Sequence, residues 1–453
     1  MKRRRLPLIL TAAVLVPAAL LPIGCRGVRY GIGSYFRAGP NYDALEAERA
    51  SLTGEGAVAP AERSGASATP PYWTRYRGPT ADGVYDEQPL DLDWPEGGPA
   101  ELWRVSVGPA YSSIVVAGGL AITMEQRRDQ EFVAAFTAEG GEVAWEHAWD
   151  ARFYEGMSKE GPRGTPIAIG DAVVALGSTG ELRCLDLATG SLRWRHGLAR
   201  EGEKDLTYGI CASPVEVGGL VVAQGTESVF AFDLATGEER WTALSERMAY
   251  ATPVVAEVLG TPTLIVSTAE RVVGLSPATG EELWAIAWRV SYGLACTQPV
   301  VVADDRIVLS AGYGKGAEMF ALQRSEGGVT AESMWRSSRF KTRFNEPIRF
   351  GPHLYGLDEG TLTCVRIEDG KREWKEGSYG YGQLLLAGDR LVLMDERGSV
   401  RVVEATPEER RELSFFEAFE GGMTLNVPAI AHGLLYVRSN AELACYDLRP
   451  STP

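Results

Sequence analysis

Thiol and imidazole groups, the usual metal ligands and nucleophiles of proteins, are few and scattered in this sequence. The 453 residues include six cysteines and four histidines. The sequence has no Cys-Cys pair or C-x-x-C motif, no two histidines at i and i+4, and no G-x-S-x-G or Walker-type motif. These patterns argue against a zinc or iron centre, and they single out no catalytic residue.

Aromatic and hydrogen-bonding side chains occur instead just before a series of short apolar segments. They are Tyr111, Arg163, Tyr208, Cys211, Tyr250, Tyr292, Cys296, Arg343, Asn345 and Asn426. If those segments form a ring, these ten residues line one funnel, which is typical of a site for a ligand or partner. The alternative is that they satisfy strand ends and fill a wet channel.

The elements that would position these residues repeat along the chain. The stretch "LDLATGSLRW" (185–194) returns as "FDLATGEERW" (232–241) and "LSPATGEELW" (275–284). Looser copies extend the series, whose tryptophans are spaced 39 to 51 residues apart. Recurrence at this period predicts an array of similar structural units.

Each unit contains four short apolar runs separated by Gly, Asp or Asn, which is the pattern of a four-stranded propeller blade. The first runs open at Ile114, Pro166, Pro214, Pro253, Pro299, Pro347, Leu384 and Pro428. The last unit ends at Leu448 without a fourth strand, whereas residues 101–108, "ELWRVSVG", form a fourth strand without the other three. We therefore predict an all-β, eight-bladed β-propeller of antiparallel blades over residues 73–453, closed by an N-terminal strand that carries Trp103.

The recurring D-x-x-T-G sequence predicts a tight turn between the third and fourth strands. Asp and Thr side chains can satisfy turn N–H groups, and Gly takes the positive φ. The tryptophan that follows is expected to pack between blades and not to stack on a ligand. These docking residues are Trp103, Trp145, Trp194, Trp241, Trp284, Trp335 and Trp374. In the seventh blade Leu413 is predicted to stand in the tryptophan position.

The cysteine positions argue against a disulfide framework in spite of their even number. Cys184, Cys364 and Cys445 share one register of the third strand in different blades, where they are expected to be buried small hydrophobes. Cys211 and Cys296 lie at the entrances to inner strands of blades three and five, and they are not predicted to pair.

The motif A/L-D-x-x-T-G-x-x-x-W resembles the docking repeat of pyrroloquinoline-quinone-type eight-bladed propellers, which include quinoprotein alcohol dehydrogenases and the outer-membrane β-barrel assembly lipoprotein. The lead-in over residues 75–113 is similar to that of exported quinoprotein-like propellers, and the resemblance covers residues 73–448. The dehydrogenases would imply a vicinal Cys-Cys pair, an Asp base, a calcium site that grips the quinone and, in many members, a haem motif. Because the Cys-Cys pair and the haem motif are missing from this sequence, no cofactor is expected. Pyrroloquinoline quinone with calcium remains an alternative without motif support.

The N-terminus reads as a targeting element: "MKRRR" precedes an apolar stretch over residues 6–24 and then Cys25. Residues 1–25 are predicted to be a signal peptide that ends at a lipidated Cys25, although Pro22 replaces the usual Leu, or to be an uncleaved anchor. A cleaved soluble form is the third alternative. Residues 26–72, rich in Ala, Gly, Ser, Glu and Pro, are predicted to be a flexible tether.

Charge and location restrict the partners. The formal net charge is −15, and without the four basic residues at positions 2–5 it is 41 − 60 = −19, which disfavours nucleic acid and anionic membrane surfaces. We expect a periplasmic or cell-envelope protein whose only membrane contact is its N-terminal segment. The favoured function is a non-catalytic binding or assembly scaffold for a protein or peptide, with a small molecule as the second choice of ligand. The alternative is a quinoprotein-like oxidoreductase with a degenerate cofactor site.

Overall fold

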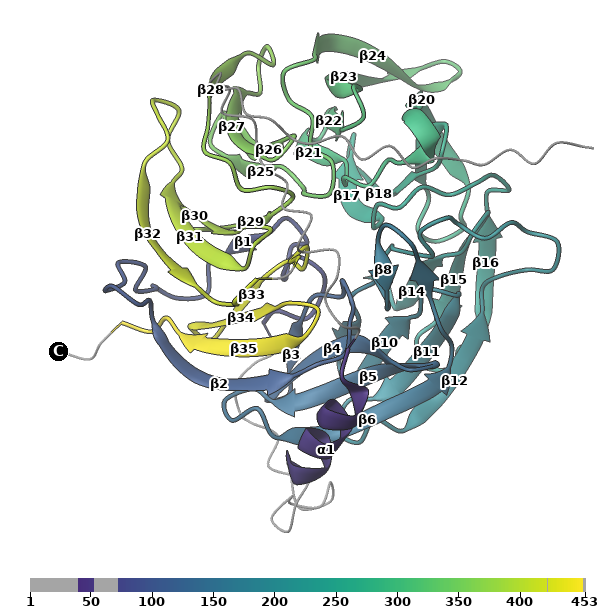
Figure 1. The fold of residues 1–453 in the computed structure, drawn as a ribbon. Coiled ribbons are helices and arrows are strands. Elements are labelled where there is room, and N and C mark those ends of the chain that lie inside the picture. The colour runs from purple at the N-terminus through teal and green to yellow at the C-terminus, as the bar shows by residue number, and fades with distance from the viewer. Residues whose placement is uncertain (1–39, 53–71, 422, 451–453) are drawn as a thin grey trace, which may run out of the picture. The chain divides into compact units, whose positions relative to one another are not determined.

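The computed structural model describes residues 40–52, 72–421 and 423–450. The chain divides into two units, Met1–Gly39 and Pro40–Pro453, and the described residues all belong to the second. They include eight blades of four antiparallel strands, arranged around a ring (Figure 1). The predicted eight-bladed propeller is confirmed. Cys25 and the predicted export segment lie outside the described residues.

The blades follow the chain in order. Blade 1 consists of β3 (Val115–Ala117), β4 (Leu120–Arg127), β5 (Gln130–Thr137) and β6 (Val143–Asp150), and blade 2 of β9 (Ile167–Ile169), β10 (Ala172–Leu176), β11 (Glu181–Asp186) and β12 (Leu192–Gly197). Blade 3 consists of β13 (Val215–Val217), β14 (Leu220–Gln224), β15 (Val229–Asp233) and β16 (Glu239–Ala243), and blade 4 of β17 (Val254–Val258), β18 (Thr261–Ser267), β19 (Arg271–Leu275) and β20 (Glu282–Ala287). Blade 5 consists of β21 (Val300–Ala303), β22 (Arg306–Ala311), β23 (Gly316–Ser325) and β24 (Gly328–Ser337), and blade 6 of β25 (Ile348–Phe350), β26 (His353–Asp358), β27 (Thr361–Arg366) and β28 (Arg372–Glu376). Blade 7 consists of β29 (Gln383–Ala387), β30 (Arg390–Met394), β31 (Ser399–Glu404) and β32 (Glu412–Glu417), and blade 8 of β33 (Ala429–Ala431), β34 (Leu434–Arg438), β35 (Glu442–Asp447) and β2 (Ala100–Ser106).

The ring closes as the sequence predicts. The N-terminal strand β2 pairs antiparallel with the C-terminal strand β35, with Trp103 opposite Cys445 and Glu101 opposite Tyr446. Without this pairing, β2 would be a lone strand and β35 would be an unpaired edge of a three-stranded sheet. Pairing satisfies the backbone hydrogen-bonding groups of both edges.

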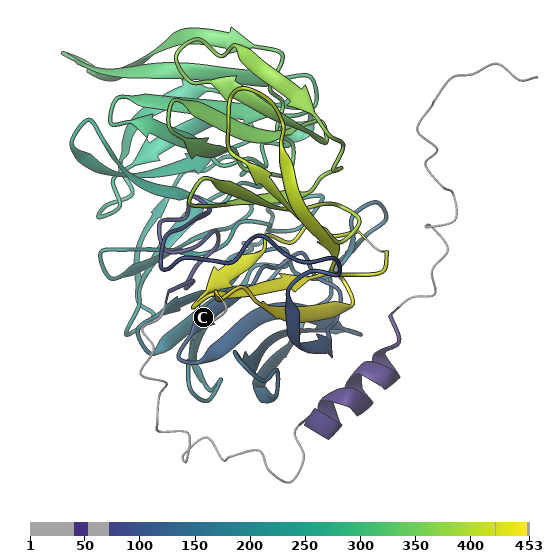
Figure 2. The ribbon, with the colours of Figure 1, turned by 90° about the vertical axis from the view of Figure 1, so that its left-hand side faces the viewer.

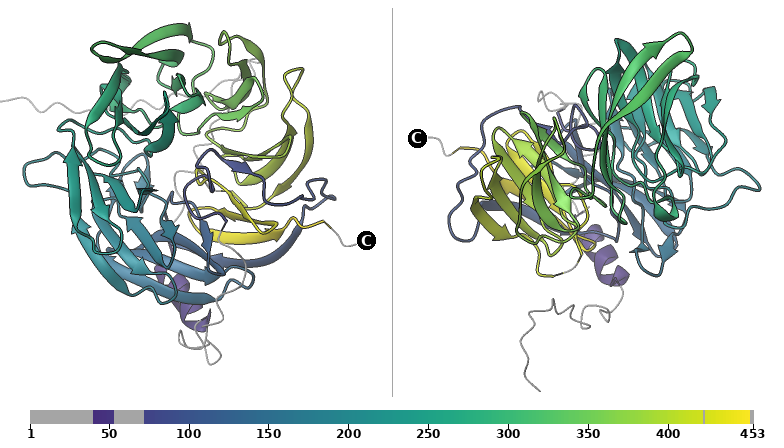
Figure 3. Two further views of the ribbon diagram at one scale, coloured as in Figure 1. Left: turned by 180° about the vertical axis from the view of Figure 1, so that it is seen from behind. Right: turned by 90° about the horizontal axis from the view of Figure 1, so that it is seen from above.

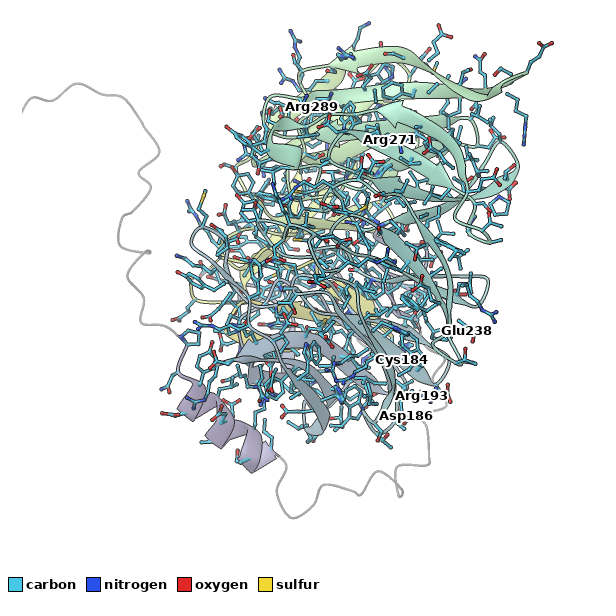
Figure 4. All side chains as sticks on the ribbon, turned by 90° about the vertical axis from the view of Figure 1, so that its right-hand side faces the viewer. Cys184, Asp186, Arg193, Glu238, Arg271 and Arg289 are labelled. Atoms are coloured by element: carbon cyan, nitrogen blue, oxygen red, sulfur yellow. The ribbon has the colours of Figure 1, made fainter. Side chains whose placement is uncertain are left out.

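The turn between third and fourth strands owes its shape to the repeated Asp, Thr and Gly. In blade 2, Asp186 Oδ1 accepts hydrogen bonds from the backbone N–H and the hydroxyl of Thr189, at 3.0 and 2.9 Å. Gly190 takes φ = 70°, which a Cβ would disfavour. Arg193 on β12 reaches back to Asp186 at 2.7 Å, beside the buried Cys184 (Figure 4).

The docking tryptophans link each blade to the next. The indole N–H of Trp194 donates to Leu234 O, in the turn of blade 3, at 2.9 Å. The indole ring also packs on Gly237 of that turn, so closely that a Cβ added to Gly237 would lie 2.6 Å from Trp194 Cγ. The same indole-to-carbonyl bond to the next blade is made by Trp103, Trp145, Trp241, Trp335 and Trp374. These side chains therefore pack between blades, as predicted.

Two seams depart from this pattern. The N–H of Trp284 on blade 4 is buried without a partner, because the neighbouring blade replaces the tight turn by the long β23–β24 hairpin. In blade 7 the prediction that Leu413 occupies the tryptophan position is wrong. The turn of blade 7 is two residues longer than that of blade 2, with ten positions from Glu404 to Ser414 against eight from Asp186 to Trp194. Ser414 therefore takes the tryptophan position, opposite Val402, and donates to Leu92 O at 2.8 Å.

The lead-in segment, residues 72–99, runs across the ring on the side seen from behind in Figure 3. Its first residues bind inner strands of blades 1 and 2: Val116 N–H donates to Trp73 O and Ala168 N–H to Thr74 O, each at 2.8 Å. It then reaches blade 7, where β1 (Val84–Tyr85) pairs parallel with β29. The segment thus links blades 1 and 2 to blade 7.

The predicted tether requires one correction. Residues Tyr42–Leu52 form the helix α1, which lies beside the ring (Figure 2). The composition of this stretch is polar, yet Leu45 and Arg49 are buried against the propeller, and docking is what stabilises so short a helix. Among the described residues no helix has the length and apolar character needed to cross a membrane.

The five described cysteines are all free. Cys184, Cys364 and Cys445 each pair directly with a docking tryptophan on the fourth strand, and all three are fully buried. Their role as small core residues is confirmed.

Candidate functional site

The side of the ring that carries the connections from each outermost strand to the next innermost strand is called the mouth face here. Its described loops are residues 107–114, 151–166, 198–214, 244–253, 288–299, 338–347, 377–382, 418–421 and 423–428. All ten residues predicted to form a funnel lie in these loops. What they do there differs from one residue to the next.

Arg163 organises the loop between blades 1 and 2. Its guanidinium lies 4.2 Å from the ring centroid of Phe153 and 5.5 Å from that of Tyr111, and it donates to Ser158 Oγ at 2.8 Å. Burial lowers the pKa of Arg163. These contacts hold a small hairpin, β7 (Tyr154–Glu155) and β8 (Lys159–Glu160), which lies near the inner margin of the ring in Figure 1.

The loops after blades 2, 3 and 4 bring two tyrosines and two thiols to the mouth. The rings of Tyr208 and Tyr250 meet edge to face, with centroids 5.7 Å apart. Burial raises the pKa of Cys211 to about 11. Burial, followed by the charges of Cys211 and Glu346, also raises the pKa of Cys296. Both thiols therefore stay protonated at neutral pH, which makes them poor nucleophiles.

Arg343, in the loop between blades 5 and 6, is held by side chains that sequence reasoning missed. It donates to Tyr381 Oη at 2.6 Å and forms an ion pair of 2.6 Å with Glu359. Its guanidinium also lies 4.5 Å from the ring centroid of Tyr313. Because Tyr313 and Tyr381 come from different loops, no sequence spacing links them to Arg343.

The two asparagines serve the backbone. Asn345 is buried, exchanges hydrogen bonds with Leu357 N–H and O, and so fixes the start of blade 6. Asn426 is also buried and donates to Ala110 O and Ser112 O at 3.1 and 2.7 Å. For these two residues the alternative given by the sequence applies: they satisfy backbone groups at strand ends and do not face a ligand.

Three large side chains of the mouth face project into solvent. Tyr292 is 87% exposed, Met157 is 78% exposed and Tyr154 is 59% exposed. Tyr292 also takes φ = 63°, a left-handed conformation that is strained for an aromatic residue. Sequence reasoning found Tyr292 but missed Tyr154 and Met157, whose only signal was the unusual length of their loop.

A buried polar group lies where the lead-in segment crosses the ring. Glu346 accepts hydrogen bonds from Tyr76 Oη at 3.0 Å and Arg77 Nη1 at 3.4 Å. Burial raises the pKa of Glu346, against the opposing effect of Arg77. Tyr76 and Arg77 thereby tie the lead-in segment to the loop between blades 5 and 6.

Two carboxylates of the mouth are already paired with arginines. Calcium takes six to eight oxygen ligands, but the carboxylates of Glu346 and Glu359 are each committed to an arginine. In the part of the chain that the structure describes, no three or more His, Cys, Asp and Glu side chains are grouped to hold a metal ion.

Two shallow grooves occur elsewhere on the ring. One of about 410 Å³ lies between the outer strands of blades 1 and 2, where Arg183, Arg195 and Glu181 meet Trp149. The other, of about 380 Å³, lies between blades 5 and 6 beside Arg336, Asp369 and Lys371. None of the ten predicted residues lines either groove.

The fold and the mouth face together define a propeller of the quinoprotein-like class. The repeats make the same packing contacts in most blades, whereas the loops of the mouth face differ from one blade to the next. The chain belongs to the family described as outer membrane protein assembly factor BamB, whose profile matches residues 97–206 and 129–376.

A protein of that description from Burkholderia pseudomallei (strain K96243) is 27% identical over 222 residues, which are 47% of this chain and 55% of the relative. The chain therefore spans about half the length of this curated relative. Two solved structures share the fold. BamB from Moraxella catarrhalis has a TM-score of 0.57 at 17% identity and covers 78% of this chain and 99% of its own. The quinohemoprotein alcohol dehydrogenase from Comamonas testosteroni has a TM-score of 0.63 at 13% identity, with 91% and 85% covered.

Proposed function

We propose that this chain is a non-catalytic, protein-binding assembly scaffold of the cell envelope, tethered to a membrane through its N-terminal segment, and that partners bind its mouth face. The observation that carries the proposal is the set of exposed large side chains on that face, Tyr154, Met157 and Tyr292. Aromatic residues and Met are enriched at protein interfaces. Strain at Tyr292 is a cost that a binding role explains.

The polar groups of the mouth support binding in preference to catalysis. Cys211 and Cys296 have raised pKa values, and Arg343 and Glu359 neutralise each other. The family to which the chain belongs, that of an outer membrane protein assembly factor, agrees with this function.

Site-specific photo-crosslinking in intact envelopes tests the proposal. A photoreactive amino acid at Met157 or Tyr292 should capture a discrete protein. The matched control is Leu192, which is 43% exposed but lies beside the Gly190 turn, at the end of β12 away from the mouth face. Equal capture at Leu192, or none at either mouth position, would count against the mouth face as the binding surface.

A separate titration tests the alternative oxidoreductase. Purified protein with pyrroloquinoline quinone and calcium should show no saturable change in the quinone spectrum and no dye-linked oxidation of primary alcohols. Turnover that needs both additives and is lost in Arg163→Ala would replace the scaffold by an enzyme.

A further inference from the structure

The helix α1 (Tyr42–Leu52) binds the seam where the ring closes, between blades 8 and 1. One carboxylate oxygen of Glu48 accepts the backbone N–H of Ser106, at 2.8 Å. Ser106 is the last residue of the ring-closing strand β2, and no described strand pairs with the outer edge of β2. Glu48 therefore satisfies an edge N–H beside the mouth loop 107–114.

The neighbouring residue on the same face of the helix, Arg49, enters a charged socket on blade 1. Arg49 lies 3.4 Å from Glu125 Oε2 and 3.7 Å from Glu146 Oε1, and its guanidinium is 4.3 Å from the ring centroid of Phe136. Arg49 and Glu125 are both buried, so each offsets the desolvation of the other. Glu125 also accepts the N–H of Gly108 at 2.6 Å, which connects the socket to the mouth loop.

The electrostatics of the socket match a cation from α1. Burial acts to raise the pKa of Glu125, but Arg49 and Arg127 outweigh it, and the pKa of Glu125 is lowered. Leu45 is buried on the same helix, and Leu52 packs on the apolar cluster that contains Trp103 and Phe136. The contacts thus come from two blades and combine an edge hydrogen bond, an ion pair and apolar packing.

Docking of α1 changes the distance between the propeller and the N-terminal segment. Sixteen residues separate Cys25 from Tyr42, and 47 separate it from Trp73. At about 3.5 Å per residue these chains span at most roughly 55 and 165 Å.

We propose that α1 is an intramolecular clasp that binds the closure seam, shortens the effective tether to the residues before Tyr42, and keeps the mouth side of that seam close to the membrane. The part that concerns the membrane rests on the proposed tethering, whereas the docking of α1 does not.

Hydrogen exchange on the full-length chain in detergent tests the docking. An isolated helix of 11 residues is marginal in water, so protection of its amides requires the socket. We expect protection in the wild type and in Ala47→Glu, which adds a charge on the exposed side. Protection should fall by about tenfold or more in Leu45→Asp and in Arg49→Glu. Exchange of wild-type α1 at the rate of an unstructured peptide would overturn the clasp.

Energy transfer on vesicles tests the consequence. With a donor at Met157 and acceptor lipids, transfer should be higher for the wild type and Ala47→Glu than for Leu45→Asp and Arg49→Glu. Equal transfer in all four proteins would overturn the shortened tether. If the full-length protein does not bind vesicles at all, the proposed tethering fails, while exchange in detergent still decides whether α1 docks.

Discussion

The inter-blade seams and the mouth face are built from the same repeats but use them in opposite ways. At the seams the same indole, carbonyl and glycine meet from blade to blade, as Trp194 and Trp241 do with the turns of blades 3 and 4. On the mouth face, by contrast, the arginines of two loops have different partners: Arg163 donates to Ser158 and Arg343 donates to Tyr381. The difference teaches that the repeat determines the packing between blades, whereas the contacts of the mouth loops are not repeated from blade to blade.

The irregular seam of blade 7 shows what the repeat requires. With no tryptophan available, Ser414 makes the hydrogen bond to Leu92 O, and a Cβ on Gly98 would lie 2.5 Å from Phe416. In the other blades these two contacts are made by the turn between the third and fourth strands of the next blade. In blade 8 the fourth strand, β2, comes from the N-terminal side, so the residues before β2 take the place of that turn. Hydrogen bond and close packing persist although the tryptophan is lost.

The largest expected effect is at a regular seam. Trp241→Ala should lower the free energy of unfolding by about 3–5 kcal/mol, since it removes a buried aromatic ring and its bond to Pro277 O. Denaturant unfolding measures this. Leu413→Ala, at a side chain that is 41% exposed, is the control and should cost less than about 0.5 kcal/mol. An unchanged midpoint for Trp241→Ala would mean that the seams do not hold the ring together.

The turn glycines should give the next largest effect. Gly190→Ala puts a methyl group about 2.5 Å from the Trp145 ring at φ = 70°, so strain and overpacking together should cost about 2–3 kcal/mol. Gly218→Ala is the matched control, because it has φ = 60° and nothing within 4 Å of the added carbon. It should cost about 1 kcal/mol from backbone strain alone. Equal losses at both positions would show that contact with the tryptophan contributes nothing.

The seams could be predicted from sequence because each is encoded locally and repeatedly. The spacing from Asp186 to Trp194 and the complementary strands at Trp103 and Leu448 predict the fold, and the longer turn of blade 7 accounts for the one-residue error at Leu413. The mouth could be located but not resolved. Tyr313 meets Arg343 only because distant loops converge, and no periodicity in the sequence records such a contact.

The sequence of helix α1 carries a signal that the average composition of residues 26–72 conceals. Ala, Leu, Glu and Arg, which make up most of its residues, are strong helix formers, and Asn41 Oδ1 accepts the N–H of Ala44 as an N-cap. What the sequence does not show is the socket at Glu125 and Glu146, about 80 to 100 residues further along the chain.

Two buried carboxylates of blade 1 should give opposite responses to pH. Burial raises the pKa of Glu131 to about 7, and its Oε2 has no hydrogen-bond partner, whereas the pKa of Glu125 is lowered. A carboxylate with a raised pKa binds more protons when folded, so its contribution lowers stability as pH rises from about 4.5 to about 7. Glu125 stabilises the fold above its unfolded pKa and loses that contribution as pH falls.

Glu131→Gln isolates the first effect. Relative to wild type, this variant should gain on the order of 2 kcal/mol between pH 5 and pH 8, as the wild-type carboxylate ionises. Thermal unfolding across this range measures the difference. A constant difference between the two proteins would mean that Glu131 is not protonated in the folded state.

Substitution of Tyr292 should give the smallest change in stability. It also best separates the binding role proposed for the mouth face from the packing role of the inter-blade seams. Its side chain is 87% exposed and its φ is 63°, so Tyr292→Gly removes almost no packing and relieves strain. The greater flexibility of glycine in the unfolded chain offsets part of the gain, and the net change should be within about 0.5 kcal/mol of zero. Capture of a partner by a photoreactive group at Met157 should nevertheless fall in Tyr292→Gly and persist in Tyr292→Phe, which keeps the ring. Loss of stability without loss of capture would place Tyr292 with the seams, as a packing residue, and would leave the mouth face without its main apolar contact.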